Sequence, residues 1–237
     1  MIAYGCVVGD RRRYRSCALP AIERLRSPED LLIEIEDGES IFRAYNEILG
    51  RAREVDGLEA LVLIHEDAEI VDPRFVEEVR DALADESVAI VGVLGGIGVT
   101  GIDWWSHDQM IGAARYRSVE PFPSWGKPLI GDGTLVGPGG AGDVDSLDGL
   151  LLILSPWAIE ELEFDEALGP GFHGYDADLC FQARERGRRV IVADLEVDHH
   201  QRQLFNDAQR EAWKRAHVAF RRKWEHRGLA SVADGKA

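Results

Sequence analysis

The chain has 237 residues, of which 45% are hydrophobic and 30% are charged. These proportions are those of a globular protein, and the length fits one large domain or two small ones, of which one domain is the simpler interpretation. The formal charge of −16 argues against a nucleic-acid partner, because phosphate backbones require a basic surface. A small phosphorylated ligand stays open, since a metal ion or local arginines can hold one at any net charge.

The cysteines and the apolar segments indicate a cytoplasmic protein. Cys6, Cys17 and Cys180 lack the paired spacing of a zinc site or a disulfide framework, and we interpret them as reduced thiols. The apolar start is too short for a signal peptide, and its basic residues follow it instead of preceding it. The longest uncharged stretch, residues 88–102, is shorter than a membrane span. We therefore expect no transmembrane segment, and peripheral attachment to the inner face of the membrane stays open.

The first part of the chain alternates between strand-like and helix-like patterns. Pro73 fits the first turn of a helix, and the apolar residues after it recur at helical spacing. The expected elements are a strand at 2–8, a helix at 17–25, a strand at 31–35, a helix at 40–54, a strand at 58–64, a helix at 73–84 and a strand at 88–94. This order predicts an α/β fold with a mostly parallel, doubly wound central sheet flanked by helices.

The texture changes after residue 94. Glycine, proline and aromatic residues dominate 95–145, which predicts loops and short strands that form a functional surface. Regular patterns then return, and Ser155 and Pro156 mark a helix start. The expected elements are a strand at 150–154, a short helix after it, a helix at 175–187, a strand at 188–197 and a charged helix at 206–227. We expect a single domain over 1–237, composed of a nucleotide-binding half (1–94), a second half (95–205) and a C-terminal helical segment (206–237).

Gly96, Gly98 and Gly101 match the dinucleotide-binding pattern G-x-G-x-x-G directly after an apolar strand. That pattern binds a pyrophosphate because a helix begins in the glycine loop. Here IDWWSHDQM follows, which is a poor helix start, and the glycines come after the fourth expected strand instead of the first. We therefore discount nicotinamide binding and expect the glycines to let the chain turn.

Acidic and imidazole side chains cluster where strands end or helices begin. The clusters are Asp37 after LLIEIE, His65-Glu66-Asp67 after LVLI, Asp176 and Asp178 in GYDADL, and His199-His200 after VADLEV. Taken singly, each has a plain structural explanation as a turn, a first-turn acid or a surface histidine. Strand ends of a parallel α/β sheet, however, meet at the edge where ligands bind. Carboxylates and imidazoles gathered there are candidate ligands for a hard divalent cation.

The ordered set of motifs resembles the GT-A fold glycosyltransferases of family-2 type, within the bacterial glycosyltransferase-like group. HED at 65–67 resembles the D-x-D signature, with His65 in place of the first aspartate. LDG at 147–149 is similar to the segment before the acceptor-side strand, GYDADLCFQARERG to the E-D-x-D-L helix, and FRRKW at 220–224 to the C-terminal ending. The chain departs from the pattern at GDRRRY, where P-x-Y-N is usual, and at Tyr175, where the glutamate is usual.

This resemblance implies a single-displacement, inverting transfer of a sugar from a nucleotide-diphosphate sugar to a hydroxyl. We expect a UDP-sugar donor, and a glycan, a lipid-linked molecule or another hydroxyl compound as acceptor. It further implies Asp176 as the catalytic base and Mn2+ or Mg2+ as the cofactor. The expected metal ligands are Asp67, Glu69, His199 and His200, and the expected substrate-binding residues are Asp37, His65, Glu66, Asp148, Trp104 and Trp105. For the two tryptophans, packing in the core is an equal alternative.

Two alternatives stay open. The missing first aspartate at His65 is compatible with a catalytically degenerate relative that binds a nucleotide-sugar or a glycan without transfer. A nucleotidyltransferase shares a similar sheet and acidic site but needs a glycine-rich basic loop after the first strand. GDRRRY supplies the arginines with one glycine, which disfavours this alternative.

Overall fold

The computed structural model describes residues 1–36, 39–106, 109–117, 134–200 and 206–234. The strands in this part of the chain are β1 (Ile2–Val7), β2 (Leu31–Ile35), β3 (Ala60–His65), β4 (Ala68–Ile70), β5 (Val88–Gly92), β6 (Leu94–Ile97), β7 (Gln109–Tyr116), β8 (Thr134–Gly139), β9 (Gly142–Asp143), β10 (Ser146–Leu147), β11 (Leu151–Leu154), β12 (Arg189–Val192) and β13 (Val197–His199). The helices are α1 (Arg11–Ser16), α2 (Ala18–Leu25), α3 (Ile41–Arg53), α4 (Phe75–Leu83), α5 (Pro156–Glu161), α6 (Tyr175–Glu185) and α7 (Asp207–Trp224), with short 3-10 turns η1 (Trp104–Ser106) and η2 (Glu166–Leu168).

Most elements expected from the sequence are present within a few residues of their predicted ends, and local capping explains several of them. The Ser40 side chain accepts a hydrogen bond from the Arg43 amide at the start of α3, and Ser155 does the same for Ala158, with Pro156 opening α5. The Asn206 and Gln209 side chains form a reciprocal capping box at the start of α7. Among the described residues, no helix is both long and apolar enough to cross a bilayer.

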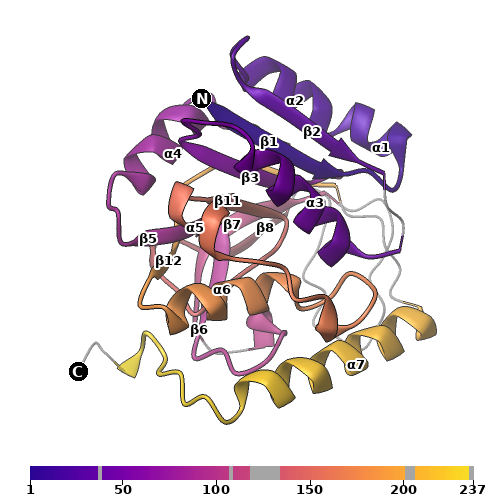
Figure 1. Cartoon of the computed structure of the whole chain (residues 1–237), viewed down its shortest axis with the longest axis vertical. Coiled ribbons are helices and arrows are strands. Elements are labelled where there is room, and N and C mark those ends of the chain that lie inside the picture. Colours follow the sequence, from indigo (N-terminus) through magenta and orange to yellow (C-terminus); the bar gives the residue numbers. More distant parts are fainter. Residues whose placement is uncertain (37–38, 107–108, 118–133, 201–205, 235–237) are drawn as a thin grey trace.

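The central sheet has seven strands among the described residues, in the order β2-β1-β3-β11-β5-β12-β9. Figure 1 shows the strands from β2 to β12 following one another down the view. β1, β2, β3, β5 and β12 run in one direction, whereas β11 and β9 run in the opposite direction. The sheet is therefore mixed, and the expectation of a mostly parallel sheet needs correction.

The correction has a physical cause in the position of β11. This strand comes from the second half of the chain and inserts between β3 and β5, pairing antiparallel with both. Its four residues are fully buried apolar side chains, so its sequence fits the middle of a sheet in either direction. As a result, the beginning of β11, not its end, lies at the edge where β1 and β3 end.

Helices cover both faces of the central sheet, because consecutive strand residues point to opposite sides. One core includes residues of α1, α2 and α4, and the other includes residues of α3, α5 and α6. Facing the first core are Tyr4, Cys6, Val62 and Ile64; facing the second are Ala3, Leu61 and Leu63. β2 pairs with one side of β1 and β3 with the other, so the strand order reverses at β1 and the gap between β1 and β3 is a topological switch point.

The glycine-rich segment after β5 builds most of a second sheet. Its strand order is β10-β6-β7-β13-β4, and β8 pairs with β7 outside this order. β4 and β13 pair antiparallel, and β13 and β7 pair parallel. The second sheet therefore brings β4, which follows β3 in the sequence, next to β13.

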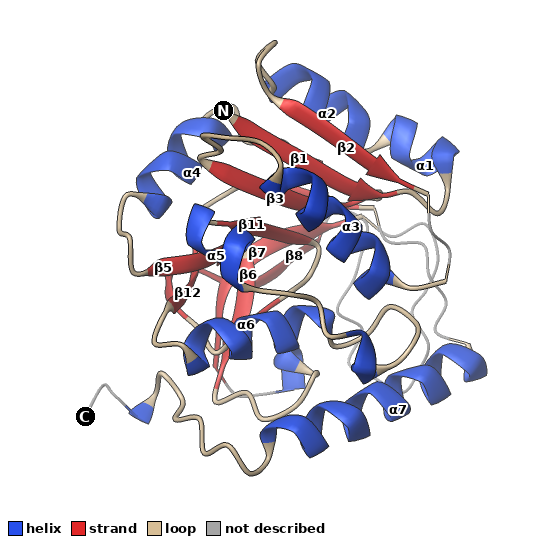
Figure 2. Ribbon diagram, in the orientation of Figure 1, coloured by secondary structure: helices blue, strands red, loops and turns tan. Residues whose placement is uncertain are grey.

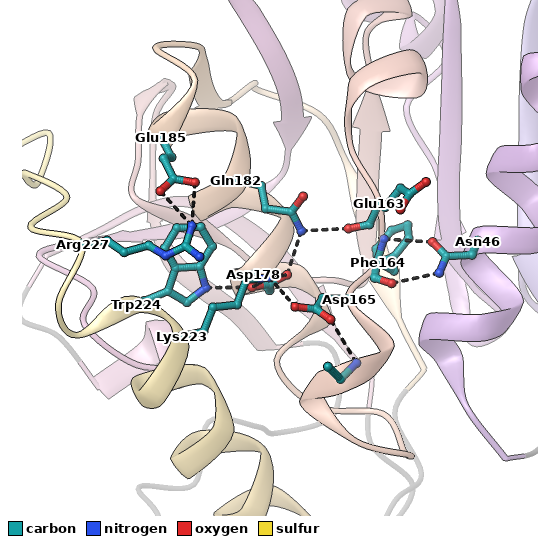
Figure 3. Close-up of polar contacts among 11 residues, drawn as sticks. Asn46, Glu163, Phe164, Asp165, Asp178, Gln182, Glu185, Lys223, Trp224 and Arg227 are labelled. Carbon is teal, nitrogen blue, oxygen red and sulfur yellow. Dashed lines mark hydrogen bonds and ion pairs between the residues drawn. The ribbon is translucent and has the colours of Figure 1, made fainter.

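The C-terminal helix α7 is attached to α6 through one buried carboxylate, which Figure 3 shows. Asp178 is 1% exposed and accepts hydrogen bonds from Trp224 Nε1 at 2.7 Å and Gln182 Nε2 at 2.8 Å. Lys223 Nζ lies 2.8 Å from the same carboxylate and 2.7 Å from Asp165. In Figure 2, α6 lies between α7 and the strands. α7 thus packs directly on the helix that carries Asp176.

Candidate active site

The turn between β3 and β4 places Asp67 beside the end of β13. In the antiparallel pairing, His199 lies opposite Ala68, the residue after Asp67, and the His200 amide donates to the Asp67 carbonyl at 2.7 Å. In the parallel pairing, the same His199 lies opposite Tyr116 at the end of β7. Strand register therefore brings together residues from three distant parts of the sequence.

The side chains of His65, Asp67 and His199 converge on a single point. One nitrogen or oxygen from each lies within 4.8 Å of the other two, and His199 Nε2 is 3.3 Å from Asp67 Oδ1. His199 Nδ1 is buried and has no hydrogen-bond partner in the part of the chain that the structure describes. Two imidazoles and a carboxylate are a donor set that fits a divalent cation such as Mn2+. The unpartnered Nδ1 leaves a hydrogen-bonding group of His199 unsatisfied beside this donor set.

Charge in this group is distributed between Asp67 and His199. Burial would raise the pKa of Asp67, but His199, His65 and Arg13 outweigh it and hold the pKa well below its usual range. Burial would lower the pKa of His199, but Asp67 and Asp148 raise it above its usual value. His65 has no such net support, and burial lowers its pKa. The group therefore combines a strongly acidic carboxyl with one imidazole of lowered and one of raised basicity.

Glu69 and His200, the other two expected metal ligands, belong to a separate group. His200 Nε2 lies 3.0 Å from Glu69 Oε2, and Asp198 completes a second set within 4.8 Å. Arg115 and Arg117 already pair with Asp198, at 3.2 and 2.6 Å. The four expected ligands thus divide between two places, and His65, expected to contact substrate, joins Asp67 and His199.

Asp148 lies just before the beginning of β11, near His65. The His65 amide donates to the Leu150 carbonyl at 3.0 Å, which anchors the segment at the end of β3. The Asp148 carboxylate accepts from the Leu150 amide at 3.0 Å and from Tyr116 Oη at 2.8 Å. The antiparallel direction of β11 is the reason that this aspartate reaches the site edge.

Asp176 reaches the same segment from the first turn of α6. Its carboxylate accepts from the Gly149 amide at 3.1 Å and from the Ala177 amide at 2.9 Å. Burial, and then the nearby Asp148 carboxylate, raise the pKa of Asp176 to about 7. A carboxylate with a pKa near neutrality is suited to accept a proton from a hydroxyl, the role expected of it.

Tyr175 links Asp176's helix to the histidine group. Its hydroxyl donates to the Gly149 carbonyl at 3.1 Å and lies 2.5 Å from His65 Nε2. A Cβ on Gly149 would lie 2.1 Å from this hydroxyl, so only glycine fits there. The position of Tyr175 therefore requires a glycine at 149. Because Tyr175 precedes Asp176 on α6, its contact with His65 holds the start of this helix next to the histidine group.

Glu66 holds the loop after β1 instead of facing open space. Its carboxylate accepts from the Gly9 and Asp10 amides, both at 2.7 Å. Asp10 in turn caps α1, which carries Arg13, and Arg13 Nη1 lies 3.3 Å from Asp67 Oδ2. The turn after β3 and the loop after β1 thus form one connected edge, while substrate binding by Glu66 stays a prediction.

The remaining expected residues are dispersed. Trp104 is 5% exposed and packs in the core, and Trp105 is 41% exposed beside it on η1. Asp37 lies outside the described residues. The amides of Gly98 and Val99 donate to a buried carboxylate of the protein itself, Asp145, at 2.6 and 3.2 Å. The G-x-G-x-x-G segment therefore turns around an internal anion, and the described residues directly after it form the 3-10 turn η1 instead of an α-helix.

Comparison with known proteins identifies the family. A sequence profile of the glycosyltransferase-like family matches residues 6–224. The chain belongs to the glycosyltransferase-like family. The resemblance expected from the HED, LDG and GYDADL motifs is thereby confirmed.

One sequence relative and two solved structures are similar to this glycosyltransferase-like chain. The streptomycin biosynthesis protein StrF of Streptomyces griseus is 28% identical over 201 residues, which are 84% of this chain and 66% of StrF, so the chain spans less than two thirds of that relative. A197 from STIV is 13% identical, with a TM-score of 0.50 over 84% of this chain and 85% of that one. GalNAc-T7, solved with UDP, GalNAc and Mn2+, is 10% identical, with a TM-score of 0.56 over 90% of this chain and 44% of that one. The structural likenesses establish a mixed α/β fold of the GT-A type.

Three residues of this glycosyltransferase-like site escaped the sequence reasoning as functional candidates. Arg13 lies in GDRRRY, which the sequence presents as a departure from the family pattern and as a source of arginines for a nucleotidyltransferase, and Tyr175 is a departure from the same pattern. Tyr116 lies at the end of a strand in the glycine-rich segment and carried no signal of its own. An unusual polar residue at a motif position is the one signal that would have found the first two.

Proposed function

We propose that the protein transfers a sugar from a nucleotide-diphosphate sugar to an acceptor hydroxyl, by a single displacement with inversion. The observation that carries this proposal is the joining of two functions at one segment: Asp176, with a pKa near 7, and the Asp67 group both lie against Asp148–Leu150. A UDP-sugar is the donor we favour, because GalNAc-T7 has the same fold and was solved with UDP and Mn2+.

Asp67 and His199, with His65, would hold a divalent cation of the Mn2+ or Mg2+ type, with Glu69 and His200 close by. The bound cation supplies positive charge that stabilises the diphosphate as it leaves. Tyr175 orients His65 through the 2.5 Å contact, and Glu66 fixes the loop that borders this group. These contacts hold the donor side of the site in place before any substrate arrives.

Asp176 would act on the acceptor side. The acceptor oxygen attacks the anomeric carbon, the bond from that carbon to the diphosphate oxygen breaks, and the acceptor proton passes to Asp176. The Gly149 amide keeps the carboxylate oriented, and Asp148, held by Tyr116, supplies the neighbouring charge that makes it basic enough. The three buried cysteines are compatible with a reducing compartment, and we place the reaction in the cytoplasm.

A transfer assay tests the proposal. Purified protein is incubated with UDP-, GDP- and CDP-sugars and Mn2+, and release of the nucleotide is measured with water and with simple glycosides as acceptors. We expect turnover with one nucleotide class, and loss of that turnover in Asp176→Asn with donor binding retained.

The degenerate relative remains the second candidate, because His65 stands where the family has its first metal-binding aspartate. It predicts donor binding without turnover under every condition. Pyrophosphate release from a nucleoside triphosphate and a sugar phosphate would point instead to a nucleotidyltransferase.

A further inference from the structure

Arg13 lies beside the switch point between β1 and β3, against the residues that follow β3. Val7 and His65 end the two strands opposite each other, and the loops after them are tied together by Glu66. Arg13 follows on α1, and its side chain is only 17% exposed. In doubly wound sheets, ligands bind at such a point outside the carboxyl ends of the strands.

The contacts of Arg13 leave its hydrogen-bonding capacity largely unused. Its Nη1 lies 3.3 Å from Asp67 Oδ2, at the long end of the range for hydrogen bonds, and 3.8 Å from Glu66 Oε1. Its Nε is buried and has no partner among the described residues. An unsatisfied buried donor costs free energy, so an arrangement that pairs it with an anion is favoured when an anion is present.

We propose that Arg13 binds the diphosphate of the donor and that, in the absence of donor, it competes with the divalent cation for Asp67. This inference rests on the proposed function. It deepens that function by assigning a residue to the donor diphosphate and by stating when Arg13 and when the cation pairs with Asp67.

The argument for competition is electrostatic. A guanidinium and a divalent cation on the same carboxylate repel each other, so each weakens the binding of the other while no further anion is present. A diphosphate relieves this repulsion, because its oxygens accept from the forked guanidinium and neutralise the cation together. Arg13 can then leave Asp67 to the metal and complete its own hydrogen bonds on phosphate.

The test compares Arg13→Met with Arg12→Met, a neighbour on the same short helix that is exposed. Mn2+ binding is measured by electron paramagnetic resonance without nucleotide. UDP and GDP binding is then measured by calorimetry in excess Mg2+, beside uridine and guanosine. Melting curves verify that each variant is folded, and Arg13→Lys, which keeps the charge without the fork, serves as a second variant.

We expect Arg13→Met to bind Mn2+ several-fold more tightly and the nucleoside diphosphate about tenfold or more weakly than Arg12→Met, the value of one charge-assisted hydrogen bond. The nucleosides should be unaffected, and Arg13→Lys should lie between. Equal values for the two methionine variants, or weaker Mn2+ binding in Arg13→Met, would overturn the assignment. Absence of binding of Mn2+ and of every nucleotide to the unmodified protein would instead overturn the proposed function.

Discussion

Replacing Lys223 by methionine tests whether α7 is held by the buried carboxylate of Asp178. Met keeps most of the length of the side chain and removes the ammonium group. Asp178 is 1% exposed, and Lys223 Nζ lies 2.8 Å from it, so the change leaves a buried charge without its cation (Figure 3). Trp224 and Gln182 still donate to the carboxylate.

Removing one partner of a buried ion pair costs about 3–5 kcal/mol. Because two hydrogen bonds to Asp178 survive, we place the loss in the free energy of unfolding at the lower end, about 3 kcal/mol. For a chain of this size, each kcal/mol lowers the melting temperature by about 2–4 °C, which gives a decrease of about 6–12 °C.

The matched control is Lys214→Met, on the same helix. Lys214 pairs with Glu211 at 2.8 Å, but both side chains are more than half exposed, and such pairs contribute about 1 kcal/mol or less. Thermal and urea unfolding of both variants is followed by circular dichroism. Equal stability of the two variants would refute the reasoning.

The stability difference between Lys223→Met and Lys214→Met should also depend on pH in a definite direction. Burial raises the pKa of Asp178 in the folded protein, and Lys223 opposes this rise. Without Lys223 the folded pKa rises further above the unfolded one, so the folded state gains stability as pH falls and Asp178 takes up a proton. The deficit of Lys223→Met relative to Lys214→Met should therefore shrink from pH 8 to pH 5. A deficit that does not shrink would exclude the buried charge as its cause.

Three further predictions concern the site. The kcat/KM of the unmodified enzyme should rise with pH through about 7, because Asp176 accepts a proton only when it is ionised. Asp176→Asn should lower kcat about 10²–10⁴-fold with little change in KM. A flat pH profile of kcat/KM would remove Asp176 from the role of base. Asp67→Ala should abolish Mn2+ binding in a resonance titration while the cooperative melt persists, and undiminished binding would place the ion elsewhere. Gly149→Ala should displace the Tyr175 hydroxyl, lowering kcat and costing about 1–3 kcal/mol of stability, whereas Gly50→Ala, which meets nothing within 4 Å on α3, should leave kcat unchanged and raise the melting temperature.

Local sequence alone determined most elements of the first half of the chain, although α1 and β4 were not expected from it. Helices such as α3 and α4 and strands such as β1, β2 and β3 follow from apolar periodicity and capping residues, which act within one element and need no partner. The same pattern placed His65, Glu66 and Asp67 at the end of a strand, and Asp176 at the start of a helix. Residue type and position relative to an element were therefore readable in advance.

The tertiary structure alone decided which of these residues meet. β11 is four buried aliphatic residues, a pattern that carries no direction, and its antiparallel insertion is what brings Asp148 and Gly149 to His65. The pairing of β4 with β13 likewise selects His199 for Asp67 and leaves His200 to Glu69. Arg13 reaches the site by contacting Asp67, which is 54 positions away in the sequence. Tyr116 reaches it because β7 pairs with β13, where His199 lies opposite it and 83 positions away. Such contacts depend on strand order and register, which a single sequence does not encode locally.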